Sequence, residues 1–152
     1  MRQTRFAAVA ALLVAVASCG DSTAPGTPNT ELAVARARWR AQNLHTYAFI
    51  LQRTCFCANT DRLYVAVLAD TVAEVIDFDS GEAVDRGLGQ TVDDLFAFIQ
   101  SAQDRGVQLI RADFDGVKGF PTSIDYDGAA QIADDELSIH VSDVHPITPQ
   151  HP

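Results

Sequence analysis

The chain has 152 residues, of which 47% are hydrophobic, so it is long enough for one folded domain and too short for two. Its 11 Lys and Arg residues against 20 Asp and Glu give a formal net charge of −9. Because nucleic-acid binding rests on clustered basic side chains, this balance argues against a phosphate-binding surface. A negative net charge is better suited to cationic partners, namely metal ions, basic peptides or polyamines. The simpler explanation is that the charge keeps the protein soluble.

Residues 1–19 have the pattern of a lipoprotein signal peptide. Arg2 and Arg5 precede an apolar run over 6–17 that is too short to span a bilayer as a helix. The sequence Val-Ala-Ser-Cys that ends at Cys19 resembles the bacterial lipobox, whose cysteine is acylated and becomes the new N-terminus. We therefore predict a lipid on Cys19, which would hold the protein at the membrane on the periplasmic or extracellular side of a bacterial cell envelope. An ordinary signal peptide is the alternative.

A tether and a first helix are expected next. Residues 20–29 are small, polar and rich in proline, which is typical of a flexible linker. A helix is predicted over 31–42, with Asn29 or Thr30 as its N-cap and Asn43 near its end. Helical spacing gives it a narrow apolar stripe of Leu32, Ala35 and Trp39.

Three strands are predicted to follow. Alternating apolar residues indicate strands over 47–54 and 63–68, and a less regular run extends from Val72 to Phe78. The intervening turns, 58–62 and 69–71, are short. Consecutive strands joined by short turns pair as an antiparallel meander.

The second helix has the clearer end signals. It is predicted over 90–105, with Thr91 as N-cap, Asp94 completing a capping box and Gly106 ending the helix. Its buried stripe is expected to contain Leu95, Phe98, Ile99 and Ala102, with Phe96 at the edge.

Three more strands are predicted, over 107–114, 122–126 and 137–141, and residues 145–152 are expected to be a disordered tail. The predicted class is therefore α+β, with the order α-β-β-β-α-β-β-β and two helices packed on one face of an antiparallel sheet. A single domain over 30–144 would contain all of these elements.

The chain resembles one family, the bacterial exported domains grouped as domain-of-unknown-function family 6174, many of which are lipoproteins. The likeness runs from about Arg38 to Val141. The Ala69-Asp70-Thr71 turn departs from the Asp-Gly turn typical of the family. The resemblance implies no activity. It rests on the order and spacing of Trp39, Tyr47, Cys55, Cys57, the Thr91–Phe96 run, Gly119-Phe120-Pro121-Thr122, Asp125 and Asp134-Asp135-Glu136.

Cys55 and Cys57 are the first candidate functional pair. In an exported domain two cysteines are expected to be oxidised, and residues two apart on a strand can be bridged where the strand bends. Such a disulfide would fix local shape. A thiol–disulfide exchange site and a soft-metal site with His45 are the alternatives.

An acidic segment is the second candidate site. Asp125, Asp127 and Glu136 fall at positions 1, 3 and 12 of an EF-hand loop, but Ala129 and Ala130 occupy positions that need an oxygen ligand and a glycine. An EF-hand is therefore rejected. A looser calcium or cation site and a solvated hairpin loop stay open. The site would use Asp125, Asp127, Asp134, Asp135 and Glu136.

Phe120 is the third candidate. Since Pro121 suits the start or the edge of a strand, Phe120 is expected to pack against the domain, with an exposed recognition role as the alternative. No catalytic motif and no cofactor signature is found. We predict a non-catalytic, lipid-anchored envelope module that binds a protein or small ligand and no nucleic acid; thiol-redox and cation-binding functions are the alternatives.

Overall fold

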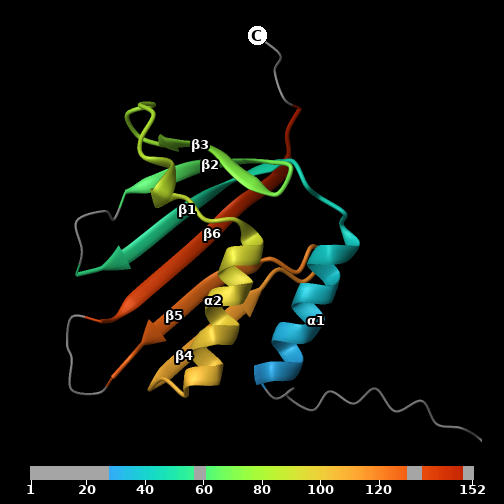
Figure 1. Cartoon of the computed structure of the whole chain (residues 1–152), viewed down its shortest axis with the longest axis vertical. Coiled ribbons are helices and arrows are strands. Elements are labelled where there is room, and N and C mark those ends of the chain that lie inside the picture. Colours follow the sequence, from blue (N-terminus) through green and yellow to red (C-terminus); the bar gives the residue numbers. More distant parts are fainter. Residues whose placement is uncertain (1–27, 57–60, 130–134, 149–152) are drawn as a thin grey trace, which may run out of the picture.

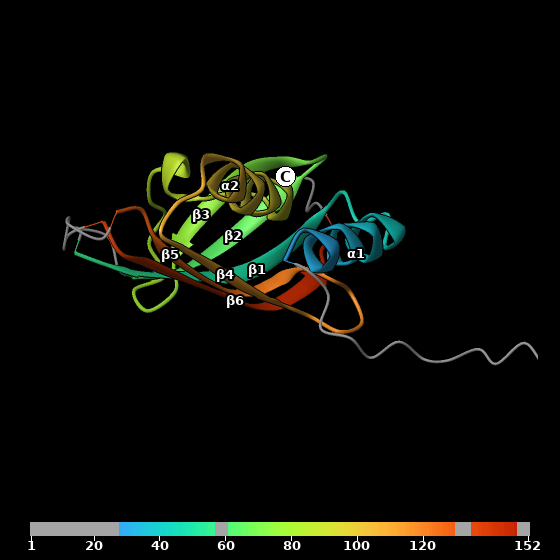
Figure 2. The same cartoon turned by 90° about the horizontal axis from the view of Figure 1, so that it is seen from below.

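The computed structural model describes residues 28–56, 61–129 and 135–148. The predicted signal peptide, nearly all of the tether, Cys57 and Asp134 lie outside these ranges. The described elements form a six-stranded sheet of order β3-β2-β1-β6-β5-β4, in which every pairing is antiparallel (Figure 1). Both α-helices lie on the same face of this sheet (Figure 2). The predicted combination of two helices with an antiparallel sheet is confirmed, and the 3-10 turn between the third strand and the second helix was not predicted.

Helix α1 spans Pro28–Ala41 and therefore begins before the predicted Asn29 or Thr30 cap. The cap prediction is wrong because proline is tolerated in the first helical turn, where its missing N–H has no intrahelical partner. The C-terminal prediction is confirmed, since Asn43 has a left-handed φ of 50° and its N–H donates to the Arg40 carbonyl at 3.1 Å.

The first three strands are β1 (Tyr47–Cys55), β2 (Arg62–Leu68) and β3 (Thr71–Asp77). Ala69 and Asp70 join β2 to β3 with φ values of 47° and 63°, which is the two-residue type I′ turn favoured in hairpins. Phe78 lies beyond β3 and is 47% exposed, so the predicted third run ends one residue too late.

A 3-10 turn, η1 (Arg86–Leu88), leads to helix α2, which spans Val92–Arg105. The predicted capping box is present: Thr91 Oγ accepts from the Asp94 N–H at 3.0 Å, and Asp94 Oδ2 accepts from the Thr91 N–H at 2.8 Å. The predicted stripe needs one correction. Phe96 is 1% exposed and stacks on Phe114 of the sheet at 6.1 Å, whereas Phe98 is only partly buried.

Strands β4, β5 and β6 complete the sheet; they span Leu109–Phe114, Pro121–Asp127 and Leu137–Pro146. Strand β6 is longer than predicted because it pairs with β1 over most of its length, from Cys55 opposite Leu137 to Tyr47 opposite Pro146. His145 and Pro146 therefore belong to the sheet, and their prediction as part of a disordered tail is wrong.

The core lies between the sheet and the two helices. The Trp39 and Tyr47 rings meet edge to face at 5.2 Å, and the Tyr47 hydroxyl oxygen accepts from the Val92 N–H at 3.1 Å. Gly119, at a φ of 85°, lies so close to α1 that a Cβ there would be 2.3 Å from the Ala35 carbonyl oxygen. These contacts hold α1 and the start of α2 against one end of the sheet. Within the described ranges, no helix covers the opposite face of the sheet (Figure 2).

Candidate functional site

The sheet face opposite the helices is open among the described residues (Figure 2). Side chains alternate between the two faces of a strand, and in β1 Leu51, Phe49 and Tyr47 point into the core. The residues between them therefore lie on the open face. Along β1 and β6 the opposed open-face pairs are Thr54 with Ser138, Gln52 with His140, and Ile50 with Ser142. We call these six residues the central row.

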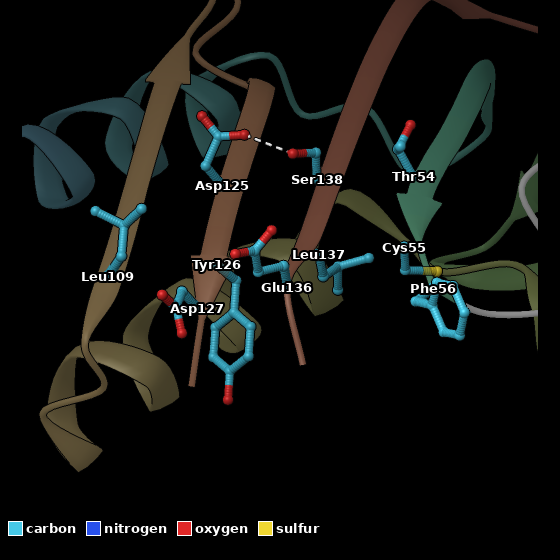
Figure 3. Close-up of a pocket in the computed structure, with 10 residues that line it drawn as sticks. All are labelled: Thr54, Cys55, Phe56, Leu109, Asp125, Tyr126, Asp127, Glu136, Leu137 and Ser138. Carbon is cyan, nitrogen blue, oxygen red and sulfur yellow. Dashed lines mark hydrogen bonds between the residues drawn. The ribbon is translucent and has the colours of Figure 1, made fainter. Parts of the chain in front are cut away.

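One end of the central row opens into a hollow of about 580 Å³, where β1 and β5 end and β6 begins (Figure 3). We call it the acidic hollow, because three carboxylates line it and its described lining contains no Lys, Arg or His. Its lining residues are Thr54, Cys55, Phe56, Leu109, Asp125, Tyr126, Asp127, Glu136, Leu137 and Ser138.

The carboxylates of this region are held in different ways. Ser138 Oγ donates to Asp125 Oδ1 at 2.7 Å across the β5–β6 pair (Figure 3). One oxygen of Asp127 and one of Asp135 are buried with no hydrogen-bond partner in the described part of the chain. A buried oxygen without a donor is costly, whereas the hollow itself is lined by the Asp125, Asp127 and Glu136 side chains.

The structure does not assemble the predicted cation site as a metal centre. Among residues 28–56, 61–129 and 135–148, no three His, Cys, Asp or Glu side chains lie close enough to hold one ion. Asp125, Asp127 and Glu136 all line the hollow, but they do not converge on one point. Asp125 and Asp127 are two residues apart on β5, and a strand separates such residues by about 6 to 7 Å. Asp134 lies outside the described residues.

The structure describes only one of the two cysteines of the predicted pair. Cys55 lines the acidic hollow, and because Cys57 lies outside the described residues, their disulfide stays a prediction. His45, the proposed soft-metal ligand, is at the opposite end of β1, where its Nδ1 is 2.8 Å from Asp70 Oδ2. His45 is therefore not a neighbour of Cys55, and a soft-metal site that combines the two is wrong.

The exposed aromatic residue at this site is Phe56. It is 86% exposed beside the acidic hollow, whereas Phe120 is 6% exposed and packs in the core. Phe120 is thus a packing residue, as the position before Pro121 predicts, and it is not available for recognition. The sequence did not predict that Phe56 is exposed at a candidate site. The available signal was its position between two cysteines at the end of a predicted strand.

A second hollow, of about 610 Å³, lies on the same face beyond the other end of the central row. We call it the apolar hollow; its lining is Tyr64, Ala66, Leu68, Ala73, Glu74, Ile147 and Thr148. Burial raises the pKa of the Tyr64 hydroxyl, and the nearby Glu74 and Asp143 carboxylates raise it further. Negative charge therefore also flanks this hollow. The alternation along β2 was the sequence pattern that could have predicted this hollow. It predicted the buried residues of the strand, and the residues between them were not considered as a surface.

Two arginines lie near these hollows and neither lines them. Arg62 pairs with Asp79, and its guanidinium lies 4.7 Å from the centre of the Phe78 ring. Arg111 is exposed on β4, directly across the ladder from Asp125. The open face therefore has carboxylates beyond both ends of the central row, and the central row itself contains none.

The family model described as "Family of unknown function (DUF6174)" matches residues 31–146. This range includes α1 after its first three residues, α2, all six strands and both hollows except Ile147 and Thr148 of the second. Neither a curated protein nor a solved structure matches the chain. No helix within the described ranges is long and apolar enough to cross a membrane.

Proposed function

Because the chain belongs to the DUF6174 family, whose description states no activity, we propose its function from the surface itself: a binding module that captures a cationic group in the acidic hollow. The observation that carries this proposal is a hollow of about 580 Å³ lined by Asp125, Asp127 and Glu136 without a basic side chain. A ligand ammonium group would donate charge-assisted hydrogen bonds to these carboxylates.

The ligand we propose is organic. The carboxylates are spread around a space much larger than one metal ion, and the lining also contains Leu109, Leu137 and Tyr126. Such a wall suits the alkyl stem of a lysine-like group, while the ring of Phe56 is placed for a cation–π contact at the rim.

We propose that this module is anchored to a membrane. The lipobox-like sequence ending at Cys19 would attach the module to a bacterial cell-envelope membrane, and removal of Arg2 and Arg5 with the signal would take its net charge from −9 to −11. An acidic body would attract basic partners. A disulfide between Cys55 and Cys57 would stiffen the strand end that carries Phe56.

Titration calorimetry of the exported domain with trilysine tests this function, and triglutamate is the charge-reversed control. Trilysine should bind, and Glu136→Gln and Asp127→Asn should each weaken it by about fivefold to tenfold, which corresponds to about 1 to 1.4 kcal/mol. Glu82→Gln is the matched control, because it removes one exposed carboxylate from a distant turn. Equal binding by all variants would contradict the proposal.

A second candidate function is thiol–disulfide exchange, which the position of Cys55 in the wall of the hollow favours. A substrate thiol seated there could reach the sulfur. The reduction potential of the Cys55–Cys57 couple tests this function, because a potential below about −300 mV is typical of a structural disulfide and would rule out exchange.

A further inference from the structure

We infer that the open face binds one extended, basic segment of a partner protein, with one basic side chain in the acidic hollow and a second in the apolar hollow. This inference rests on the proposed function and adds to it the length, conformation and charge spacing of the partner.

The two hollows lie near opposite ends of the same stretch of β1. Thr54 lines the acidic hollow, and Ala48, six residues earlier on β1, lies opposite Ala66 of the apolar hollow. A strand advances about 3.3 Å per residue, so the hollows are separated by roughly 20 Å. A single small ammonium compound cannot occupy both.

The strip between them is suited to a polypeptide backbone. The central row offers the hydroxyls of Thr54, Ser138 and Ser142 and the amide of Gln52, with only Ile50 apolar and only His140 titratable. Hydroxyl and amide groups can both donate and accept, as a passing peptide backbone requires. Carboxylates are absent from this row and occur at its two ends.

The apolar hollow complements a basic side chain with an alkyl stem. Ala66, Leu68 and Ile147 give it apolar walls, while Glu74 in its lining and Asp143 near Tyr64 supply negative charge. A lysine or arginine could lay its stem on the apolar wall and keep its charged head beside Glu74.

The geometry also fixes the spacing of the two basic residues. An extended segment advances at the same rate as β1, so its two basic residues should be about six positions apart. Residues separated by an even number lie on the same face of an extended chain, so both side chains would point toward the sheet. A helix would need about 13 residues for the same distance.

The experiment compares two nine-residue peptides of identical composition, one with lysines at positions 2 and 8 and one with lysines at positions 2 and 3, serine elsewhere. Titration calorimetry of the exported domain should show the spaced peptide binding at least about tenfold more tightly. Glu74→Gln should weaken the spaced peptide and leave the adjacent one unchanged, whereas Glu136→Gln should weaken both. Glu82→Gln should change neither.

The outcomes separate the two proposals. Equal affinities for the two peptides, or no effect of Glu74→Gln on the spaced peptide, would overturn the two-hollow inference while the Glu136 effect still supported the proposed function. Absence of binding by both peptides to the wild-type domain would overturn both.

Discussion

The hydroxyl oxygen of Tyr47 accepts a hydrogen bond from the backbone N–H of Val92 at 3.1 Å, and this contact ties the start of β1 to the first turn of α2. Both residues are buried, at 2% and 0% exposed. Burial raises the pKa of the Tyr47 hydroxyl above its ordinary value, so the phenol stays neutral across the physiological range.

Removal of this hydroxyl should destabilise the domain. Tyr47→Phe leaves a buried N–H of α2 without its partner, and we expect a loss of about 1 to 3 kcal/mol in the free energy of unfolding measured in urea. Tyr64→Phe is the control, because Tyr64 lies on the open face and is only half-buried. Equal stability of Tyr47→Phe and wild type would show that the hydrogen bond contributes nothing.

The turn between β4 and β5 contains a matched pair of glycines. Gly119 has a φ of 85° and faces α1, where a Cβ would be 2.3 Å from the Ala35 carbonyl oxygen; a Cβ on Gly116 would meet nothing within 4 Å. Gly119→Ala combines backbone strain with displacement of α1, so we expect a loss of about 2 to 4 kcal/mol, against less than about 1 kcal/mol for Gly116→Ala. Thermal and urea unfolding of the two variants measure the difference. Similar losses at both positions would mean that α1 is not seated on this turn.

Asp115 makes stability depend on pH. Hydrogen bonds from the backbone N–H groups of Lys118 and Val117 lower the pKa of the Asp115 carboxyl below its ordinary value. A group whose folded-state pKa is lowered stabilises the fold above the unfolded-state value, and this contribution is lost as the pH falls through the folded-state pKa.

Asp115→Asn should therefore cost about 1 kcal/mol at pH 7, and the difference from wild type should shrink below about pH 4, as the unfolded carboxyl becomes protonated. Urea unfolding at several pH values measures this change. Asp104→Asn, on the exposed side of α2, corrects for the loss of one negative charge. A difference that stayed constant down to pH 2 would contradict the charge-assisted explanation.

Arg111 offers a test of the acidic hollow by gain of affinity. Its side chain is exposed across the ladder from Asp125 and carries positive charge next to the hollow without lining it. Arg111→Gln removes that repulsion, so trilysine should bind about twofold to threefold more tightly at low salt, and the gain should decrease as the salt concentration rises. Arg40→Gln, on exposed α1, is the control. Weaker binding by Arg111→Gln would place the ligand elsewhere.

Local rules in the sequence determined much of this fold. The Thr91–Asp94 capping box, the glycine end of α2 at Gly106 and the buried alternation of β1 and β2 depend on residues a few positions apart, and all three were predicted. The family was also evident from short motifs, and the match over residues 31–146 confirms it.

The tertiary structure decided how these elements meet. The pairing of β1 with β6 joins residues about 90 positions apart along the chain, and no local pattern encodes it. That pairing extended β6 to Pro146, created the central row and brought Asp125 and Glu136 beside Cys55 and Phe56. The full burial of Phe96 likewise followed from its stack on Phe114 of the sheet. The sequence thus predicted the elements and their buried faces, while only long-range packing produced the open face on which a partner would bind.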